Sequence, residues 1–289
     1  MVFIRQIFRF SFVVLLLSCS VKTGTESLAI QKEELNLSDR KVCLFLAEME
    51  EGTLLKVGED NCKKSSPSMY VFQPVLALAA LELGTLKDPH GYFPWDKTKF
   101  PYIRWQKEQN LKSSLESSTV WYFQKIWTDT GTTKLRTWLS SVGLPTSVPF
   151  EPSRSFWMDG GYSWTAEEFY LFLWKLFNGE LEVRKKNLNS VLEGLERNPG
   201  EIKNPTGIHR LDGHFGNYSG FYSDSATGYA QGRSVSWYWF FWKDPKRSYL
   251  FLSRIESESE TLSPLEAAKF GMEYLREKGF WEKYFSSSN

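Results

Sequence analysis

The sequence predicts an α+β fold, in which a central antiparallel sheet is flanked by helices and carries an all-helical lobe. Strand-like segments lie near both ends of the chain, with helix-like segments between them. The stretch from Tyr70 to Gly84 has no polar face, as expected for a helix at the centre of a lobe, and Gly84 stands where a left-handed C-terminal cap is wanted. The aromatic run Trp237–Trp242 fits a central strand covered on both faces, with an exposed stacking surface as the alternative.

The N-terminus has the pattern of an export signal. Two arginines precede the apolar run Phe10–Leu17, which is too short to span a bilayer and is typical of a secretory signal peptide over residues 1–18. The segment Leu16–Cys19 resembles a bacterial lipobox, which implies that acyl chains on Cys19 anchor the exported protein to a membrane of the bacterial cell envelope. Residues 19–39 are then the acylated cysteine and a polar tether. A plain signal peptide with a coincidental cysteine is the alternative.

The first two strands are expected over Val42–Glu48 and Thr53–Val57, joined by a short turn. Cys43 lies in the first of them, and Cys62 follows the second on the way to the apolar helix. In an exported protein these two cysteines can form a disulfide, which would pin the entrance of the helix to the sheet. Two buried free thiols are equally compatible with the sequence.

The middle of the chain is predicted to be helical. Glu167 and Glu168 lie in the first turn after Thr165, a pattern typical of a helix N-terminus. The predicted helices span Leu115–Trp127, Thr132–Ser141, Thr165–Phe177 and Leu188–Glu196. A loop-rich stretch, Asn198–Asn217, follows them, and a turn is expected at Asp244–Lys246. The last three strands and a closing helix are expected over Gly220–Gly228, Ser234–Trp242, Ser248–Ile255 and Pro264–Lys278.

The composition fits one domain over residues 40–289. The 289-residue chain is 42% hydrophobic, enough for a substantial core, and contains no internal repeat. Its net charge of +1 comes from scattered basic residues, which argues against a nucleic-acid partner. The histidines His90, His209 and His214 are scattered and form no ligand cluster, and no Cys-x-x-Cys occurs, so we expect no metal. Nothing points to a cofactor.

The apolar helix carries the most specific pattern in the chain. Phe72 and the Leu-Glu-x-Gly ending at Leu81–Gly84 resemble class D β-lactamases, in which Ser-Thr-Phe-Lys begins such a helix. In the penicillin-interacting serine enzymes, this serine attacks an acyl carbonyl and the lysine three residues later activates it. Here Tyr70 falls on the serine position and Gln73 on the lysine position.

Other elements of the same family occur in its order, from about Lys41 to the C-terminus. They are Trp95-Asp96-Lys97 for the Trp-Asp element, Ser118-Thr119-Val120-Trp121 for Ser-x-Val, Phe156-Trp157, and Ala226-Thr227-Gly228 for Lys-Thr-Gly. The departures are systematic, since alanine replaces the strand lysine, Val142–Leu144 stands for Tyr-Gly-Asn, and Glu266 falls at the substrate-binding arginine. The resemblance implies a β-lactamase/transpeptidase-like fold.

The resemblance also identifies the positions where catalysis would occur, none of which we expect to be active. A phenol has an ordinary pKa of about 10, and an amide neither takes its proton nor forms a carbamate. Losing a nucleophile and its base together removes several orders of magnitude in rate. The family's catalytic positions are occupied by Tyr70, Gln73, Ser118 and Ala226.

Ligand contacts are implied by the same resemblance, and each has a structural alternative. Ser118 is also placed to cap a helix, Trp157 to pack in the core, and Thr227 to end an ordinary strand. The implied ligand-binding positions are Ser118, Val120, Trp157, Thr227 and Gly228.

The sequence favours a lipid-anchored, class D β-lactamase-like domain without acyl-enzyme chemistry. It would bind a peptidoglycan-derived peptide, a β-lactam or an envelope protein non-covalently. A divergent enzyme with a displaced serine, Ser68 or Ser118, is one alternative, and a β-lactam sensor is another. Both of these need acylation, which Gln73 and Ala226 disfavour.

Whether the groove is open or filled distinguishes a ligand-binding domain from a purely structural one. A pocket in which Ser118, Thr227 and Gln73 converge would favour binding. A groove filled by Tyr70 and tryptophans would favour a purely structural role.

Overall fold

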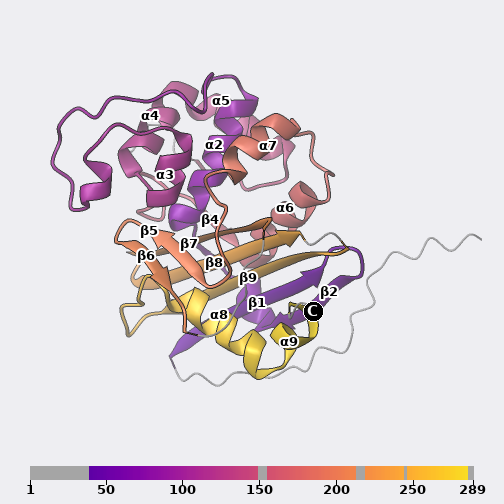
Figure 1. The fold of residues 1–289 in the computed structure, drawn as a ribbon. Helices are drawn as coiled ribbons and strands as arrows, with labels where there is room; N and C mark the ends of the chain where they lie inside the picture. Colours follow the sequence, from indigo (N-terminus) through magenta and orange to yellow (C-terminus); the bar gives the residue numbers. More distant parts are fainter. Residues whose placement is uncertain (1–38, 149–154, 213–218, 244–245, 286–289) are drawn as a thin grey trace, which may run out of the picture.

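The computed structural model describes residues 39–148, 155–212, 219–243 and 246–285. The predicted α+β architecture is confirmed: the chain builds a five-stranded antiparallel sheet in the order β2-β1-β9-β8-β7 (Figure 1). Strand β1 pairs with β9 along its whole length, so the two ends of the domain meet in the middle of the sheet. The strands are β1 Arg40–Glu48, β2 Gly52–Val57, β7 Phe221–Ala230, β8 Arg233–Lys243 and β9 Ser248–Ser257.

The sheet separates two apolar cores. The larger core lies between the sheet and the helical lobe, and the smaller one lies between the sheet and the C-terminal helices (Figure 1). The lobe contains α2 Phe72–Glu82, α3 Leu111–Ser117, α4 Val120–Thr130, α5 Thr132–Ser141, α6 Ala166–Phe177 and α7 Lys185–Leu192. The opposite face is covered by α8 Glu266–Glu277 and α9 Phe280–Tyr284.

Strand β8 confirms the two-sided burial expected for the aromatic run. Trp237 and Trp239 join the core under the lobe, while Tyr238 and Phe240 join the core under the C-terminal helices. All four are buried, because successive strand residues point to opposite faces and both faces are covered. The exposed stacking surface is therefore excluded.

Helix α2 runs through the centre of the lobe and is buried on all sides, apart from its last turn. Gly84 follows it with φ +69°, as expected for a left-handed cap. The helix begins at Phe72 and not at Tyr70, because Met69–Val71 form a separate 3₁₀ turn, η1. Met69 enters that turn with φ 52°, which an α-helix does not allow.

Two local predictions are wrong in an instructive way. The predicted helix Leu115–Trp127 is two helices, because Ser118 adopts a left-handed backbone with φ 47° that ends α3 and lets α4 start in a new direction. The stretch Asn198–Asn217, which is predicted to be loop-rich, contains a hairpin of the two short strands Glu201–Asn204 and Gly207–Arg210. Helix α5 has the predicted bounds, and the capping box at Thr165 is present. Asp244 and Pro245 of the predicted turn lie outside the described residues.

The remaining elements are short. They are α1 Glu59–Cys62, β3 Ser65–Pro67, η2 Ile103–Trp105, β4 Ser163–Thr165, β5 Glu201–Asn204 and β6 Gly207–Arg210. No helix in the described part of the chain has the length and apolar character that crossing a bilayer requires. The signal peptide, Cys19 and the tether lie in residues 1–38, outside the described residues.

Candidate functional site

The elements that resemble a serine acyl-transfer site come together in the fold. The turn η1 packs against β7 and β8, and α2 contacts both α3 and α4. Tyr70 therefore lies beside the strand that carries Ala226, and Ser118 lies at the junction of two helices that pack on α2. The convergence of elements expected from the sequence is present.

Tyr70 sits half-buried at the start of α2. Burial raises the pKa of its phenol to about 12, and the neighbouring Tyr102 adds to the shift. Among the described residues no side chain accepts a hydrogen bond from it. The phenol is thus protonated at neutral pH and has no adjacent base, so it is a poor nucleophile.

Gln73 lies one turn further along α2 and is only 2% exposed. Its amide nitrogen is buried and has no hydrogen-bond partner among the described residues. An unpartnered buried amide costs roughly 1–3 kcal/mol, so this position is not optimised for stability. The residue is also unable to act as a general base.

Met69 fills the space between η1 and β7. It has no exposed surface, and a Cβ atom added to Gly228 would stand only 2.7 Å from its Sδ atom. Ala226, on the same face of β7, is buried as well. Met69 therefore occupies the space beside β7 at Gly228, on the side that faces the lobe. The sequence predicts Tyr70 and tryptophans as the filling residues if this groove is closed.

Ser118 is a helix-terminal residue with almost no exposed surface. Its backbone N–H donates to the Ser114 carbonyl and ends α3 in the left-handed conformation. The neighbouring hydroxyls of Ser117 and Thr119 share a 2.9 Å hydrogen bond, and the Trp105 indole donates to the Ser117 carbonyl at 2.7 Å. Ser118 thus ends α3 through its backbone, and the N-cap residue of α4 is Thr119. Val120 is half-buried at the first position of α4.

Thr227 and Trp157 do not face a common pocket with Gln73. The Thr227 hydroxyl shares a 3.0 Å hydrogen bond with Ser236 and donates to the Ser263 carbonyl at 3.2 Å, next to α8 on the other side of the sheet. Trp157 is completely buried and stacks on Phe72. Its complete burial fits the alternative that Trp157 packs in the core. The two Thr227 hydrogen bonds show that its side chain points away from the lobe that contains Gln73 and Ser118.

Asp224 is a buried carboxyl that the sequence reading missed. It stands two residues before Ala226 in β7, so both side chains point to the lobe. Burial raises the pKa of Asp224 to about 7, against the opposing effect of the Arg197 charge. The same burial lowers the pKa of Arg197. The sequence feature that could have revealed Asp224 is an acidic residue at an inward-facing position of a predicted strand.

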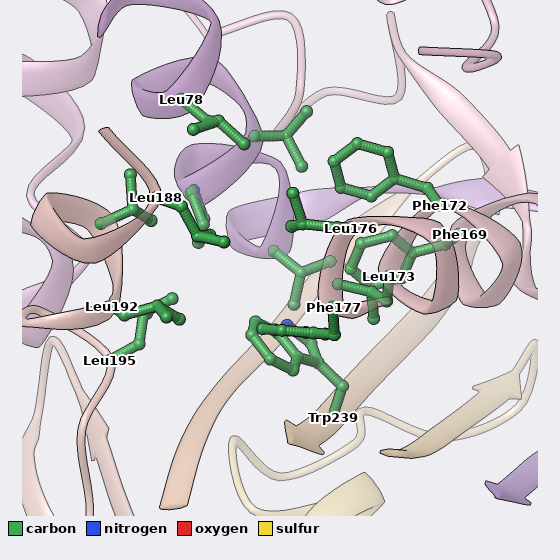
Figure 2. A pocket seen from close by; sticks show the side chains of 14 residues that line it. Leu78, Phe169, Phe172, Leu173, Leu176, Phe177, Leu188, Leu192, Leu195 and Trp239 are labelled. Atoms are coloured by element: carbon green, nitrogen blue, oxygen red, sulfur yellow. The ribbon is translucent and has the colours of Figure 1, made fainter. Parts of the chain in front are cut away.

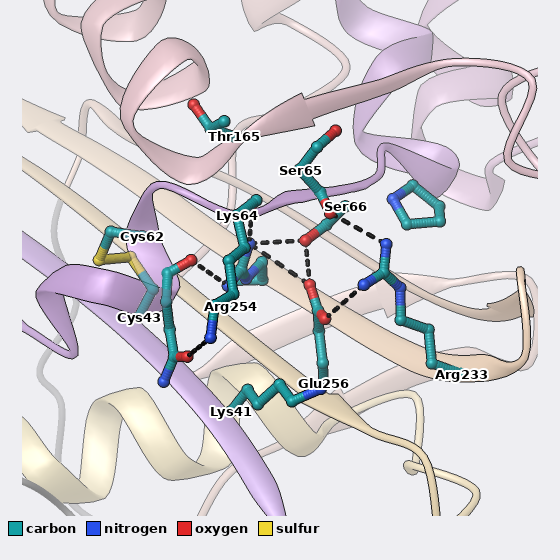
Figure 3. A network of polar contacts seen from close by, with 12 residues as sticks. Lys41, Cys43, Cys62, Lys64, Ser65, Ser66, Thr165, Arg233, Arg254 and Glu256 are labelled. Carbon is teal, nitrogen blue, oxygen red and sulfur yellow. Dashed lines mark hydrogen bonds and ion pairs between the residues drawn. A yellow bond between two sulfur atoms is a disulfide. The ribbon is translucent and has the colours of Figure 1, made fainter.

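A buried polar network holds the segment that leads into η1 (Figure 3). Arg254 is fully buried and donates to the Asn61 and Lys64 carbonyls at 2.6 and 2.8 Å, and to the Ser66 hydroxyl at 2.6 Å. Glu256 contacts the same hydroxyl and pairs with Arg233 at 3.3 Å. The network therefore ties β3 to strands β8 and β9.

The disulfide Cys43–Cys62 lies beside this network (Figure 3). Of the two states that the sequence left open, the structure has the bridged one. It joins β1 to α1, with 19 residues of sequence separation. In the described residues no group of histidine, cysteine and acidic side chains could hold a metal ion, and His214 lies outside them.

An apolar cavity lies between α2, α6, α7 and β8 (Figure 2). Its volume is about 20 Å³, room for one water molecule at most. Leucine, valine and phenylalanine side chains line it, with Trp239 at one end. A water needs two or more polar partners, so we regard this cavity as a dry packing defect and not as a ligand site.

Comparison with known proteins shows which families the sequence resembles. A family profile described as the penicillin binding protein transpeptidase domain matches residues 66–182. The regulatory protein BlaR1 of Bacillus licheniformis is 29% identical over 184 residues, which cover 62% of this chain and 30% of BlaR1. The β-lactamase OXA-20 of Pseudomonas aeruginosa is 33% identical over 107 residues, covering 37% of this chain and 40% of the enzyme. By these matches the chain is similar in sequence to penicillin-binding transpeptidase domains and class D β-lactamases.

Solved structures show the same fold. The C-terminal domain of the Bacillus licheniformis BlaR penicillin receptor matches with a TM-score of 0.69 and 21% identity, over 84% of this chain and 92% of that domain. A class D β-lactamase from Bacillus subtilis matches with a TM-score of 0.66 and 19% identity, over 87% and 94% of the two chains. The aligned segments of the two curated relatives span less than half of each relative's length.

Proposed function

We propose that this chain is a lipid-anchored envelope protein whose penicillin-binding domain no longer acylates and recognises its ligand or partner non-covalently. The observation that carries the proposal is the pair Tyr70 and Gln73. The phenol has a raised pKa and no base beside it, and the amide is a buried donor without a partner. Neither half of a Ser-x-x-Lys mechanism has a chemical substitute at its position.

The displaced serines give little support to a divergent enzyme. Ser68 has no exposed surface, and its hydroxyl donates to the Tyr162 carbonyl at 3.3 Å. Ser118 is 2% exposed and terminates a helix. A nucleophile must reach the substrate carbonyl, and neither hydroxyl is accessible without rearrangement.

The relatives suggest candidates for what is recognised. One curated relative is a regulatory protein and one matched structure is a penicillin receptor. The relatives favour a β-lactam or a peptidoglycan-derived peptide as the ligand. Met69 fills the space beside β7 at Gly228, which favours an envelope protein that binds another surface of the domain. The anchor part of the proposal rests on the lipobox-like Leu16–Cys19 and the apolar run before it.

The test is intact-protein mass spectrometry with a fluorescent penicillin. The full chain is incubated beside a Tyr70→Ser/Gln73→Lys variant. We expect no adduct on the natural chain. An adduct on that chain would overturn the proposal, and peptide mapping would then identify the serine.

Two controls make a negative result informative. Heat-denatured protein reports non-specific acylation, and penicillin G at saturating concentration should compete with any specific label. The anchor is tested by the mass of the protein from membranes, where Cys19→Ala should abolish an acyl-chain increment. An unchanged mass in the natural protein would remove the anchor from the proposal.

A further inference from the structure

A second concave site lies on the outer side of the lobe, between the segment Pro94–Phe100 and helix α4. Its volume is about 600 Å³, within the range of roughly 300–1,000 Å³ that small-ligand sites occupy. None of the positions implied by the family resemblance for catalysis lines it. The lining residues are Pro94, Asp96, Thr98, Phe100, Trp121, Gln124, Lys125, Trp127 and Thr128.

The wall opposite α4 is a built structure. At its base, Phe93 and Gln109 exchange two backbone hydrogen bonds of 2.8 and 3.1 Å. Within it, the Trp95 indole donates to the Thr98 carbonyl at 2.8 Å, and the Asp96 carboxylate accepts from the Thr98 N–H at 2.9 Å. The segment therefore holds its shape through its own hydrogen bonds, and the cleft is preformed.

The floor of the cleft is aromatic. Phe100 and Trp121 are partly exposed and Trp127 is buried beneath them. The Trp121 indole N–H is already used, since it donates to the Trp105 carbonyl at 2.8 Å. Trp121 thus offers a ligand its ring surface and no hydrogen bond.

Polar groups stand on the α4 side of the same cleft. The Gln124 amide has no hydrogen-bond partner within the described part of the chain. The Thr128 hydroxyl donates to the Gln124 carbonyl at 2.9 Å, which leaves its oxygen free to accept. Lys125 is paired with Asp129 at 3.2 Å and lies over the Phe93 ring.

The combination favours a neutral ligand with one apolar face and polar edges. Asp96 and Lys125 carry opposite charges at the rim, so the cleft selects neither anions nor cations. Ring faces accept the C–H face of a pyranose, and a free amide with hydroxyl acceptors suits hydroxyl and acetamido groups. We propose that this cleft binds a saccharide chain of N-acetylated sugars. The inference is independent of the penicillin-binding groove.

The test is isothermal titration calorimetry of the full chain in a detergent without a sugar headgroup. The probe is the β-1,4-linked tetramer of N-acetylglucosamine. Acetyl-Lys-D-Ala-D-Ala serves as a peptide probe. We expect binding of the tetramer, weakened at least about tenfold by Gln124→Ala and several-fold by Thr128→Val.

Thr137→Val is the matched control for Thr128→Val. Thr137 is also an exposed helical threonine whose hydroxyl donates to the carbonyl four residues earlier, at 3.0 Å, but it lies in α5 and does not line the cleft. This variant should bind the tetramer as the natural chain does.

Three results would overturn the proposal: no heat with the tetramer, equal affinity in the Gln124→Ala variant, or binding of the peptide in place of the saccharide. Because the penicillin assay reads a different site, a failure here leaves the proposed function standing. Failure of the penicillin assay likewise leaves this cleft untouched.

Discussion

The network beneath β3 and the start of α2 differ in how their buried polar groups are paired. Beneath β3, the buried charges of Arg254 and Glu256 are held by one another, by Arg233 and by backbone carbonyls. At the start of α2, a few residues later, the positions that carry charge or a nucleophile in related enzymes hold Tyr70 and Gln73. The first region therefore holds paired buried charges, whereas the second holds a phenol without a base beside it and a buried amide without a partner. The difference indicates that the fold depends on the first region and tolerates change in the second.

The largest expected effect is in the scaffold. Replacing Glu256 by glutamine should leave the fully buried guanidinium of Arg254 and the partly exposed one of Arg233 without this counter-charge, and we expect a loss of about 3–5 kcal/mol in the free energy of unfolding. Urea unfolding of the full chain, followed by tryptophan fluorescence, measures it. Glu258→Gln is the control, because Glu258 pairs with Lys41 at the surface and its removal should change little. Equal stability of both variants would contradict the comparison.

Asp224 lies in β7 on the same face as Ala226, and it should make the free energy of unfolding depend on pH. Its pKa of about 7 in the fold lies above its ordinary value of 3.8, so the folded state binds a proton that the unfolded state releases. The stabilisation is present below about pH 4 and is lost as pH rises through 7, by at most about 4 kcal/mol. Urea unfolding at pH 4.5 and 8 compares the natural chain with Asp224→Asn. Identical pH slopes in the two proteins would refute this assignment.

The disulfide should stabilise the scaffold through its closed loop. For a sequence separation of 19 residues, the loss of chain entropy in the unfolded state is worth roughly 3 kcal/mol. We expect the urea midpoint to fall on reduction with dithiothreitol. A Cys43→Ala/Cys62→Ala variant should have the lower urea midpoint without dithiothreitol, and adding dithiothreitol should not change it. A natural chain that does not respond to reduction would show that the bridge contributes nothing.

Gly228→Ala tests whether the groove is filled. The new methyl group would stand against Met69, and overpacking at a buried site typically costs about 1–3 kcal/mol. Met69→Ala in the same chain should remove most of that penalty, and the double-mutant cycle isolates the contact. Gly228→Ala with unchanged stability in both backgrounds would mean that the space beside β7 is open.

The smallest effect is expected at Gln73, and it should be a gain. Methionine has a similar length and no buried donor, so Gln73→Met should raise stability by about 1 kcal/mol. Gln106→Met is the control, because the Gln106 amide donates to the Phe100 carbonyl at 3.1 Å and its loss should destabilise. A destabilised Gln73→Met variant would reveal that the amide holds a ligand or a water molecule.

Most of the architecture follows from patterns that act over short distances. Apolar continuity predicts α2, the aromatic run Trp237–Trp242 predicts the central strand β8, and the residues around Thr165 predict the start of α6. The family elements also predict which segments meet, and η1, α2 and β7 do pack together. What the short patterns missed is local geometry set by contacts, such as the left-handed Ser118 and the hairpin β5–β6.

The sequence by itself determined the fold class, the resemblance to penicillin-binding and class D β-lactamase domains, and the presence of Tyr70 and Gln73 at the positions that this resemblance assigns to the serine and the lysine. Only the tertiary structure decided that Met69 occupies the space at Gly228, that Thr227 faces α8, and that Asp224 is buried. Residue identity fixes which atoms are available for chemistry, and local periodicity predicts helices and strands. Accessibility, pKa and the filling of a groove depend on side chains brought together from distant parts of the chain, so they emerge only when the packing is known.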